Sequence, residues 1–218
     1  MPFDHSIADR EALRRLYAEP HPTINAKVID RLDEGARAFL ARAPFVAVAT
    51  SGPNGGDVSP RGGPPGFVAV LDDRRLALGD LAGNRRLDSF ENLLANPAIG
   101  LMFLIPGMSE TLRVNGRATL TTDPQVLHAC TFDGIEPRVA IGVDVDEVFL
   151  HCAKAFRRSG LWDPTSWPAD DERPRAADIW RAHLHLDVSA DLIEADLEQG
   201  YAESMWQAGG EDAPAPAG

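Results

Sequence analysis

The sequence lacks the short motifs that most often identify a reaction. It contains no GxGxxG after a strand, no GxxxxGK[ST], no HExxH and no GxSxG. The common dinucleotide, nucleoside-triphosphate, zinc-protease and serine-hydrolase sites therefore have no local support. His183 and His185 stand two residues apart without a third ligand nearby, so we expect no metal site. The only cysteines, Cys130 and Cys152, form no CxxC pair, and we expect two reduced thiols.

Long apolar segments are also missing. The amino terminus is charged from Asp4 onward and has no apolar core like that of a signal peptide. No run approaches the ~20 residues needed to cross a bilayer. These features predict a cytoplasmic protein. The formal net charge of −12 at pH 7 argues against a nucleic acid or an anionic membrane as the main partner. Any phosphate site must therefore be a local concentration of arginine.

The chain is expected to form one domain over residues 1–207, since no long linker divides it, and a disordered tail over 208–218. Apolar residues at three- and four-residue spacing predict one helix over roughly 24–42, after a weaker helix around 8–17. Three further helices are expected, at 84–96, 153–160 and 190–206.

Most of the remaining sequence is β-rich and broken by tight turns, such as the Gly-Pro-Asn-Gly-Gly run at 52–56. We count six strands in this region, which suggests an antiparallel sheet that closes on itself and so removes its edges. The predicted fold class is α+β and mainly β. Seven β-type runs carry it, one more than the six strands expected in the sheet: 45–51, 57–61, 67–71, 74–79, 98–105, 111–122 and 139–150.

The informative polar residues lie in three places: Arg61 in the run SPRGG, the triplet Asn84–Arg86, and Arg113 on a long strand. The triplet is expected to open a helix, with its asparagine as the N-cap. Free backbone amides together with two arginines are suited to a phosphate monoester. The alternative is a solvated face on which these arginines pair with Asp88 and Glu91.

The order of several motifs resembles the pyridoxamine 5′-phosphate oxidase-like family of FMN-binding split barrels. The runs that carry the resemblance are APFVAVATS, VSPRGGPPGF, GNRRLDSFENLLANPAIGLMFLIPG, ETLRVNGRATL and HCAKAFRRSGLW. They are closest to the bacterial branch with GN-x-R-x-DS and ETLRVNG signatures. The resemblance extends from about Ile24 to Trp162 and is more specific than any one motif.

This resemblance implies a six-stranded antiparallel split β-barrel of the Greek-key type with flanking helices. It also implies a homodimer with two FMN molecules at the subunit interface. Trp162 is expected either to wall the pocket or to lie in the core. The residues that the resemblance assigns to the cofactor are Ser59, Pro60, Arg61 and Gly62 from one strand, Asn84, Arg85 and Arg86 at the phosphate, Thr111 from the long strand, and Lys154 and Arg158 from the other subunit. We add Arg113, on the same long strand, because of its charge.

The implied function is an FMN-dependent oxidoreductase acting on a small organic substrate. Arg61, Arg113 and Lys154 are candidates to stabilise the anionic reduced flavin. No residue stands out as a general acid or base, and we assign no catalytic residue. The run RAHLHLD at 181–187 does not match the substrate-holding segment of authentic pyridoxamine phosphate oxidases. Two alternatives stay open: a deazaflavin-dependent reductase on the same fold, and a non-catalytic flavin-binding or storage protein.

Overall fold

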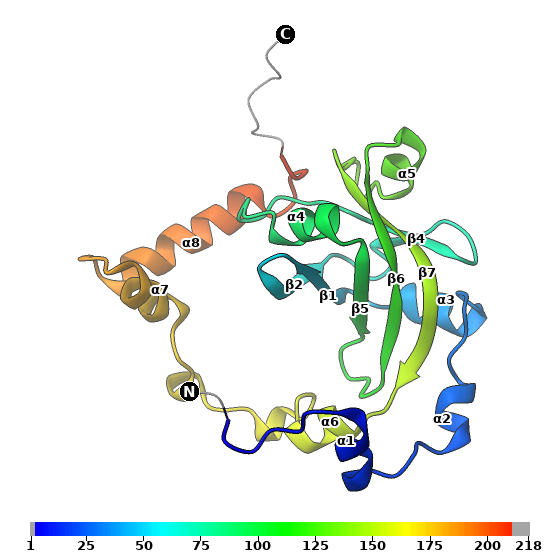
Figure 1. Ribbon diagram of the computed structural model, residues 1–218. Coiled ribbons are helices and arrows are strands. Elements are labelled where there is room, and N and C mark those ends of the chain that lie inside the picture. The colour runs from blue at the N-terminus through cyan, green and yellow to red at the C-terminus, as the bar shows by residue number, and fades with distance from the viewer. Residues whose placement is uncertain (1–2, 211–218) are drawn as a thin grey trace.

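The computed structural model describes residues 3–210 and contains a single curled antiparallel sheet with helices around it (Figure 1). The strand order is β2-β1-β5-β6-β7-β4-β3. The predicted split barrel is confirmed. The strands are β1 (Phe45–Gly52), β2 (Gly55–Gly62), β3 (Val68–Val70), β4 (Arg75–Gly79), β5 (Ala98–Leu104), β6 (Thr111–Thr121) and β7 (Ala140–His151).

The predicted count of six strands was one too few. Three hairpins and β7 make seven, because even the three-residue strand β3 pairs with β4 through Val68–Leu78. The expected closure is incomplete, since β2 and β3 form the two edges of the sheet and are not neighbours in it. The sheet is therefore a half-barrel with one long exposed edge at β2.

The core follows from the alternation of side chains along the strands. In β1, Val46 and Val48 are fully buried, and their neighbours in β5, Leu101 and Phe103, are buried with them. Residues in between point to the opposite face of the sheet. A β2 side chain whose residue pairs directly with Val46 or Val48 therefore points to the same, concave face of the sheet.

The predicted helix over 24–42 was wrong. The region forms two short helices, α2 (Pro22–Ala26) and α3 (Glu34–Leu40), after the first helix, α1 (Arg10–Leu16). Between them the chain pairs with β7 through Ile29 and Val148, with N–O distances of 3.0 and 2.7 Å. Asp33 then caps α3, accepting from the backbone of Ala36 at 2.8 Å. Strand pairing and an internal cap thus override the apolar periodicity.

Helix α4 (Asp88–Ala95) packs against the barrel, and the helices that follow it connect strands or continue the chain beyond β7. Helix α4 follows β4, and Asn92 on it donates to the Thr50 hydroxyl of β1 at 3.1 Å. Helix α5 (Pro124–Ala129), which was not predicted, links β6 to β7. Helix α6 (Lys154–Ser159) follows β7. Two 3₁₀ turns, Pro164–Ser166 and Asp170–Glu172, then lead to α7 (Ala176–Leu184) and α8 (Ala190–Ser204).

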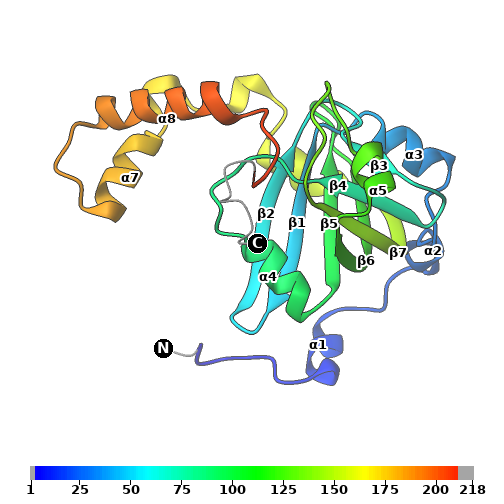
Figure 2. The same ribbon diagram turned by 90° about the horizontal axis from the view of Figure 1, so that it is seen from above.

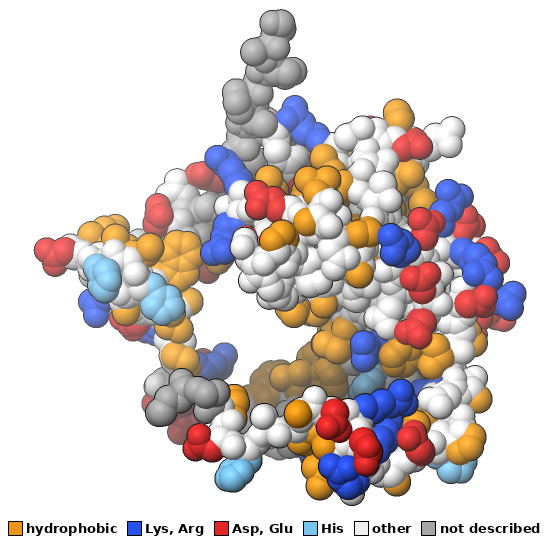
Figure 3. Space-filling model, in the orientation of Figure 1, with side chains coloured by type: hydrophobic (Ala, Val, Ile, Leu, Met, Phe, Trp, Pro, Cys, Tyr) orange, Lys and Arg blue, Asp and Glu red, His pale blue; other side chains and the backbone are white. Residues whose placement is uncertain are grey.

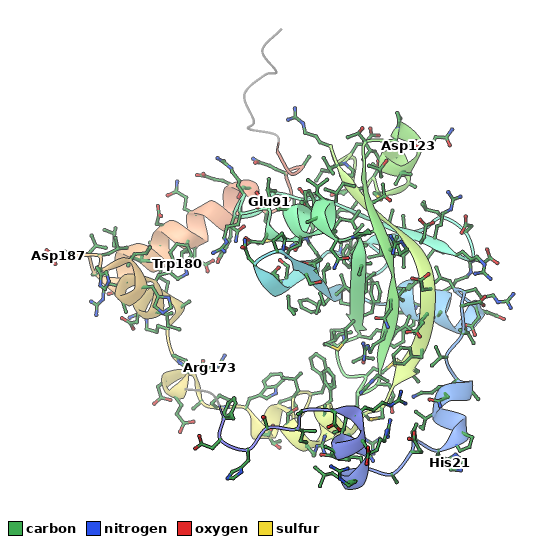
Figure 4. The ribbon with its side chains drawn as sticks, in the orientation of Figure 1. His21, Glu91, Asp123, Arg173, Trp180 and Asp187 are labelled. Carbon is green, nitrogen blue, oxygen red and sulfur yellow. The ribbon has the colours of Figure 1, made fainter. Side chains whose placement is uncertain are left out.

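Helices α7 and α8 form an arm that stands beside the barrel, as the view from above shows (Figure 2). They pack against each other through Ala177, Ala190 and Ile193. Arg173 lies on the connection that leads to this arm, and Asp187 lies at its far end (Figure 4). Space-filling drawing shows a hollow between the arm and the barrel, with hydrophobic side chains along its margin (Figure 3).

The chain returns from α8 to the barrel. Ala208 forms an antiparallel bridge with Leu81, so residues 208–210, which were predicted to begin a disordered tail, are held in place. The rest of that predicted tail, 211–218, lies outside the described residues. None of the helices between residues 3 and 210 combines the length and the apolar character needed to span a bilayer.

Candidate functional site

A cleft of about 640 Å³ opens between the β2 edge, the start of α4 and the segment after α8. Clefts of this size commonly hold small organic ligands and cofactors. Three separate parts of the sequence supply its walls. Its lining includes every residue that the sequence analysis placed on the first two motifs: Ser59, Pro60, Arg61, Gly62, Asn84, Arg85 and Arg86.

The strand β2 supplies one wall. Arg61 pairs with Val46 of β1 and Ser59 pairs with Val48, so both side chains share the face of these core residues. The Arg61 guanidinium donates to the Ser59 hydroxyl at 3.1 Å and to the Pro60 carbonyl at 3.0 Å. These bonds keep the cation against its own strand at the edge of the cleft.

The Asn84–Arg86 triplet, which was predicted to hold a phosphate, does not open the helix as predicted. Asn84 is not the N-cap of α4; Leu87 occupies that position and makes no side-chain cap bond. The Asn84 side chain instead accepts from the Arg86 backbone at 3.1 Å and forms a tight turn. Arg85 and Leu87 have φ angles of 59° and 58°, which side chains other than glycine rarely adopt. Such strain concentrates at ligand sites, where the surroundings impose it.

Within this turn, Arg86 pairs with Asp88, with 2.7 Å between Nε and Oδ2. Part of the alternative interpretation, an arginine paired with Asp88, is thus realised. Hydrogen bonding to Asp88 raises the pKa of the guanidinium, and Asp57 adds to this effect. Both side chains are largely exposed, and exposed pairs contribute little to stability. An anionic ligand could therefore replace Asp88 at Arg86 at little cost.

Ser89 is the residue that the sequence analysis missed at this site, although it ends the GN-x-R-x-DS signature. It is 2% exposed, lines the cleft, and its hydroxyl has no hydrogen-bond partner among residues 3–210. It lies in the first turn of α4, where backbone N–H groups also lack intrahelical acceptors. Buried polar groups are nearly always paired, so an unpartnered hydroxyl beside free amides indicates a place for an external acceptor.

Asp80 is a second residue that was not predicted. It lines the cleft at the end of β4, and burial raises the pKa of its carboxyl, while the nearby Arg61 acts in the opposite direction. The only sequence signal was its place in the run GDLAGNRR, shortly before the Asn84–Arg86 turn. The cleft thus combines arginines with a carboxyl group that holds its proton more strongly than usual.

Four residues assigned to the cofactor do not line this cleft within the chain: Thr111, Arg113, Lys154 and Arg158. Thr111 is buried on β6, and Arg113 stacks over the Phe149 ring at 5.1 Å. Lys154 and Arg158 are exposed on α6, which lies across the hollow from α4 (Figure 1).

Trp162, the aromatic residue expected either in the pocket wall or in the core, takes neither position in this chain. It is half-buried, stacks on Phe156 at 5.7 Å and donates to the Met108 carbonyl at 2.9 Å. No group of three histidine, cysteine or acidic side chains that could hold a metal ion occurs in the part of the chain that the structure describes.

The pyridoxamine 5′-phosphate oxidase family model matches residues 32–152, more than half of the chain. The chain belongs to this family. The match ends just before α6, so the α7–α8 arm and the segment that returns to the cleft lie outside the family region. A search of curated proteins found no significant match.

Solved structures with a similar fold include a putative pyridoxamine 5′-phosphate oxidase from Lactobacillus delbrueckii, with 21% identity, 56% of this chain and 95% of that chain covered, and a TM-score of 0.43. An FMN-binding protein from Syntrophomonas wolfei shows 12% identity, 55% and 85% coverage, and a TM-score of 0.43. HupZ from Group A Streptococcus shows 15% identity, 54% and 92% coverage, and a TM-score of 0.45. The family assignment rests on the family model.

Proposed function

We propose that this member of the pyridoxamine 5′-phosphate oxidase family is an FMN-dependent oxidoreductase that acts on a small organic substrate. The observation that carries the cofactor assignment is the start of α4. There, the buried hydroxyl of Ser89, which has no partner among residues 3–210, meets the free helix amides and Arg86 at one cleft. This set of donors suits the dianion of a phosphate monoester.

The residues that would hold FMN divide into two groups. Asn84 shapes the turn, while Arg85, Arg86 and Ser89 supply donors for the phosphate. Ser59, Pro60, Arg61 and Gly62 line the cleft along β2, where they would bind the remainder of the cofactor. When bound, FMN supplies hydride transfer, and the protein contributes position and electrostatics.

The phosphate assignment favours FMN over a deazaflavin coenzyme. The donors form one compact group over residues 84–89, and the chain carries a net charge of −12. A deazaflavin coenzyme has a longer anionic tail, which needs an extended basic groove. Mass spectrometry of the small molecule released on denaturation tests this assignment. We expect FMN, and a deazaflavin or a protein that stays colourless after incubation with FMN would contradict it.

We further propose that two chains build each cofactor site. Lys154 and Arg158 lie on α6, which carries three basic residues and no acidic one in an acidic chain, and they do not line the cleft of their own chain. The face opposite the core also carries exposed apolar side chains where β1, β2 and β5 lie together: Val58 is 67% and Met102 38% exposed. Exposed apolar faces of this kind are typical of subunit interfaces.

Mixed dimers test the shared site. Arg86→Ala chains and Lys154→Ala/Arg158→Ala chains should each bind FMN weakly. When the two are mixed, each heterodimer should recover one wild-type site, which flavin fluorescence would detect. If heterodimers form but no tight binding returns, both halves of the site lie in one chain.

Catalysis itself is tested by turnover. We expect NAD(P)H to be oxidised when the FMN-loaded protein is supplied with an electron acceptor. Stoichiometric flavin binding without turnover under these conditions would instead support a flavin-binding or storage protein.

A further inference from the structure

The segment after α8 pairs with the loop that precedes the turn at Asn84–Arg86. This turn is called the phosphate-gripping turn below, after its proposed role. The Ala82 amide donates to the Gln207 carbonyl at 2.9 Å, and the Gly209 amide donates to the Asp80 carbonyl at 3.1 Å. Between these bonds, Leu81 and Ala208 form an antiparallel bridge. The loop is therefore held in the manner of a strand, by residues more than 120 positions away in the sequence.

This segment is fixed to the barrel at both of its ends. The Trp206 ring lies 5.5 Å from the ring of Phe132, at an angle of 49°. The Arg138 guanidinium donates to the Gly210 carbonyl. Both contacts are to the loop between α5 and β7, which belongs to the family region of the chain. The segment therefore connects the barrel to the loop over 80–82.

Glycine at position 209 is required for the close approach. A Cβ atom there would lie 1.9 Å from Asp80 Oδ2 and 3.3 Å from the Leu81 carbonyl oxygen. Gly209 is buried, and its backbone covers the Asp80 side chain. Any side chain at 209 must displace either Asp80 or the segment itself.

The segment also reaches the cleft. Met205, Gly209 and Gly210 line it together with the phosphate-gripping turn. Only Gly83 separates the paired loop from Asn84, where that turn begins. Since the turn has two residues with positive φ, it needs fixed neighbours to keep its shape.

We propose that the segment Met205–Gly210, which lies outside the family region, is a positioning element of the phosphate site. By pairing with the loop over 80–82, it holds Asn84 and Arg86 in the arrangement that binds a phosphate monoester. This inference rests on the proposed function for the identity of the ligand. It assigns to the carboxy-terminal segment a larger share of the affinity for FMN than of the affinity for riboflavin, which lacks the phosphate.

Two truncations test the role of the segment. A chain that ends at Gly210 keeps the segment, and a chain that ends at Ser204 lacks it. We expect the first to bind FMN as the full chain does. The second should bind FMN about tenfold more weakly, because the turn must then be ordered at the moment of binding. Its riboflavin affinity should fall by much less, because riboflavin has no phosphate, and amide exchange at Ala82 should become fast.

Two point variants separate positioning from a general loss of structure. Gly209→Ala places a methyl group against Asp80, whereas a methyl group at Gly200 on α8 would meet nothing within 4 Å. Gly209→Ala should weaken FMN binding and speed exchange at Ala82, and Gly200→Ala should do neither. Equal FMN affinity of the two folded truncations would overturn the proposal. Equal losses for FMN and riboflavin would also overturn it, because they would indicate a structural role.

Inorganic phosphate distinguishes this inference from the proposed function. If the full chain binds no flavin, yet phosphate slows exchange at the Arg86 amide only when the segment is present, the FMN assignment fails and the positioning role stands. If flavin binds equally with and without the segment, the positioning role fails and the proposed function stands.

Discussion

Removing the Ser89 hydroxyl should change stability and cofactor binding in opposite directions. The hydroxyl is buried and unpartnered among the described residues, and an unsatisfied buried polar group costs ~1–3 kcal/mol. We therefore expect Ser89→Ala to make the ligand-free protein more stable by about 1 kcal/mol. The same change removes a donor to the phosphate. A hydrogen bond to a charged acceptor contributes ~1.5–3 kcal/mol, so FMN should bind about 10- to 150-fold more weakly.

Thr50→Val provides a matched control, since it also removes one buried hydroxyl. Thr50 accepts from Asn92 at 3.1 Å, and its loss leaves the amide group unpaired. We expect this variant to be less stable by about 1 kcal/mol, with an unchanged ratio of FMN to riboflavin affinity. Thermal denaturation of the ligand-free proteins and titration with both flavins measure these effects. A destabilised Ser89→Ala protein, or one that binds FMN as the wild type does, would refute the reasoning.

Three further predictions concern neighbouring groups. Arg86→Ala should weaken FMN binding about 10- to 100-fold and leave riboflavin binding nearly unchanged. Arg75→Ala is the control, because it removes an exposed ion pair of the same 2.7 Å length outside the cleft, and it should change neither affinity. Burial raises the pKa of Asp80, so the folded protein holds the proton of this carboxyl group more strongly than the unfolded chain does. The stability that the proton contributes is therefore lost as pH rises through the pKa of Asp80 in the folded protein. Asp80→Asn should therefore gain in Tm relative to the wild type between about pH 3.5 and pH 7, and a constant Tm difference would contradict this. Burial raises the pKa of Cys130 to about 11, so its thiol should resist alkylation at about pH 8 until the protein unfolds; mass spectrometry of alkylated peptides would detect an early reaction.

The parts of the fold that depend on local sequence were predictable. Alternating apolar residues and turn residues placed the strands to within a few positions, and Pro53-Asn54 closes the first hairpin as expected between Gly52 and Gly55. The grouping of Arg61 with the triplet at 84–86 was also predictable, because the order of motifs resembled that of a known family. Both inferences depend on neighbours in sequence or on a pattern retained along the chain.

The failures have two physical causes: contact between distant segments, and backbone conformations that local propensity disfavours. The helix predicted over 24–42 breaks where Ile29 pairs with β7. The helix predicted from Asn84 begins four residues later, because the intervening turn adopts positive φ angles that no local propensity favours. The return of the chain to Leu81 through Ala208 has no periodic signal at all. Composition alone made that end of the chain look disordered.

The carboxylates beside the arginines are consistent with an anion site. An acidic protein that concentrates cations at one cleft must keep them oriented when no anion is bound, because unpaired guanidinium groups repel one another. Asp88 holds Arg86 through an exposed ion pair, and exposed pairs are weak enough to be exchanged for a phosphate. Asp80, beside Arg61, has a raised pKa, so its carboxyl group takes up a proton more readily than usual. It therefore repels a bound anion less than an ordinary carboxylate would. Ser89 contributes no charge, and its hydroxyl has no partner among the described residues that a ligand would have to displace. The same cleft can thus keep its arginines oriented and still favour an anion when one binds.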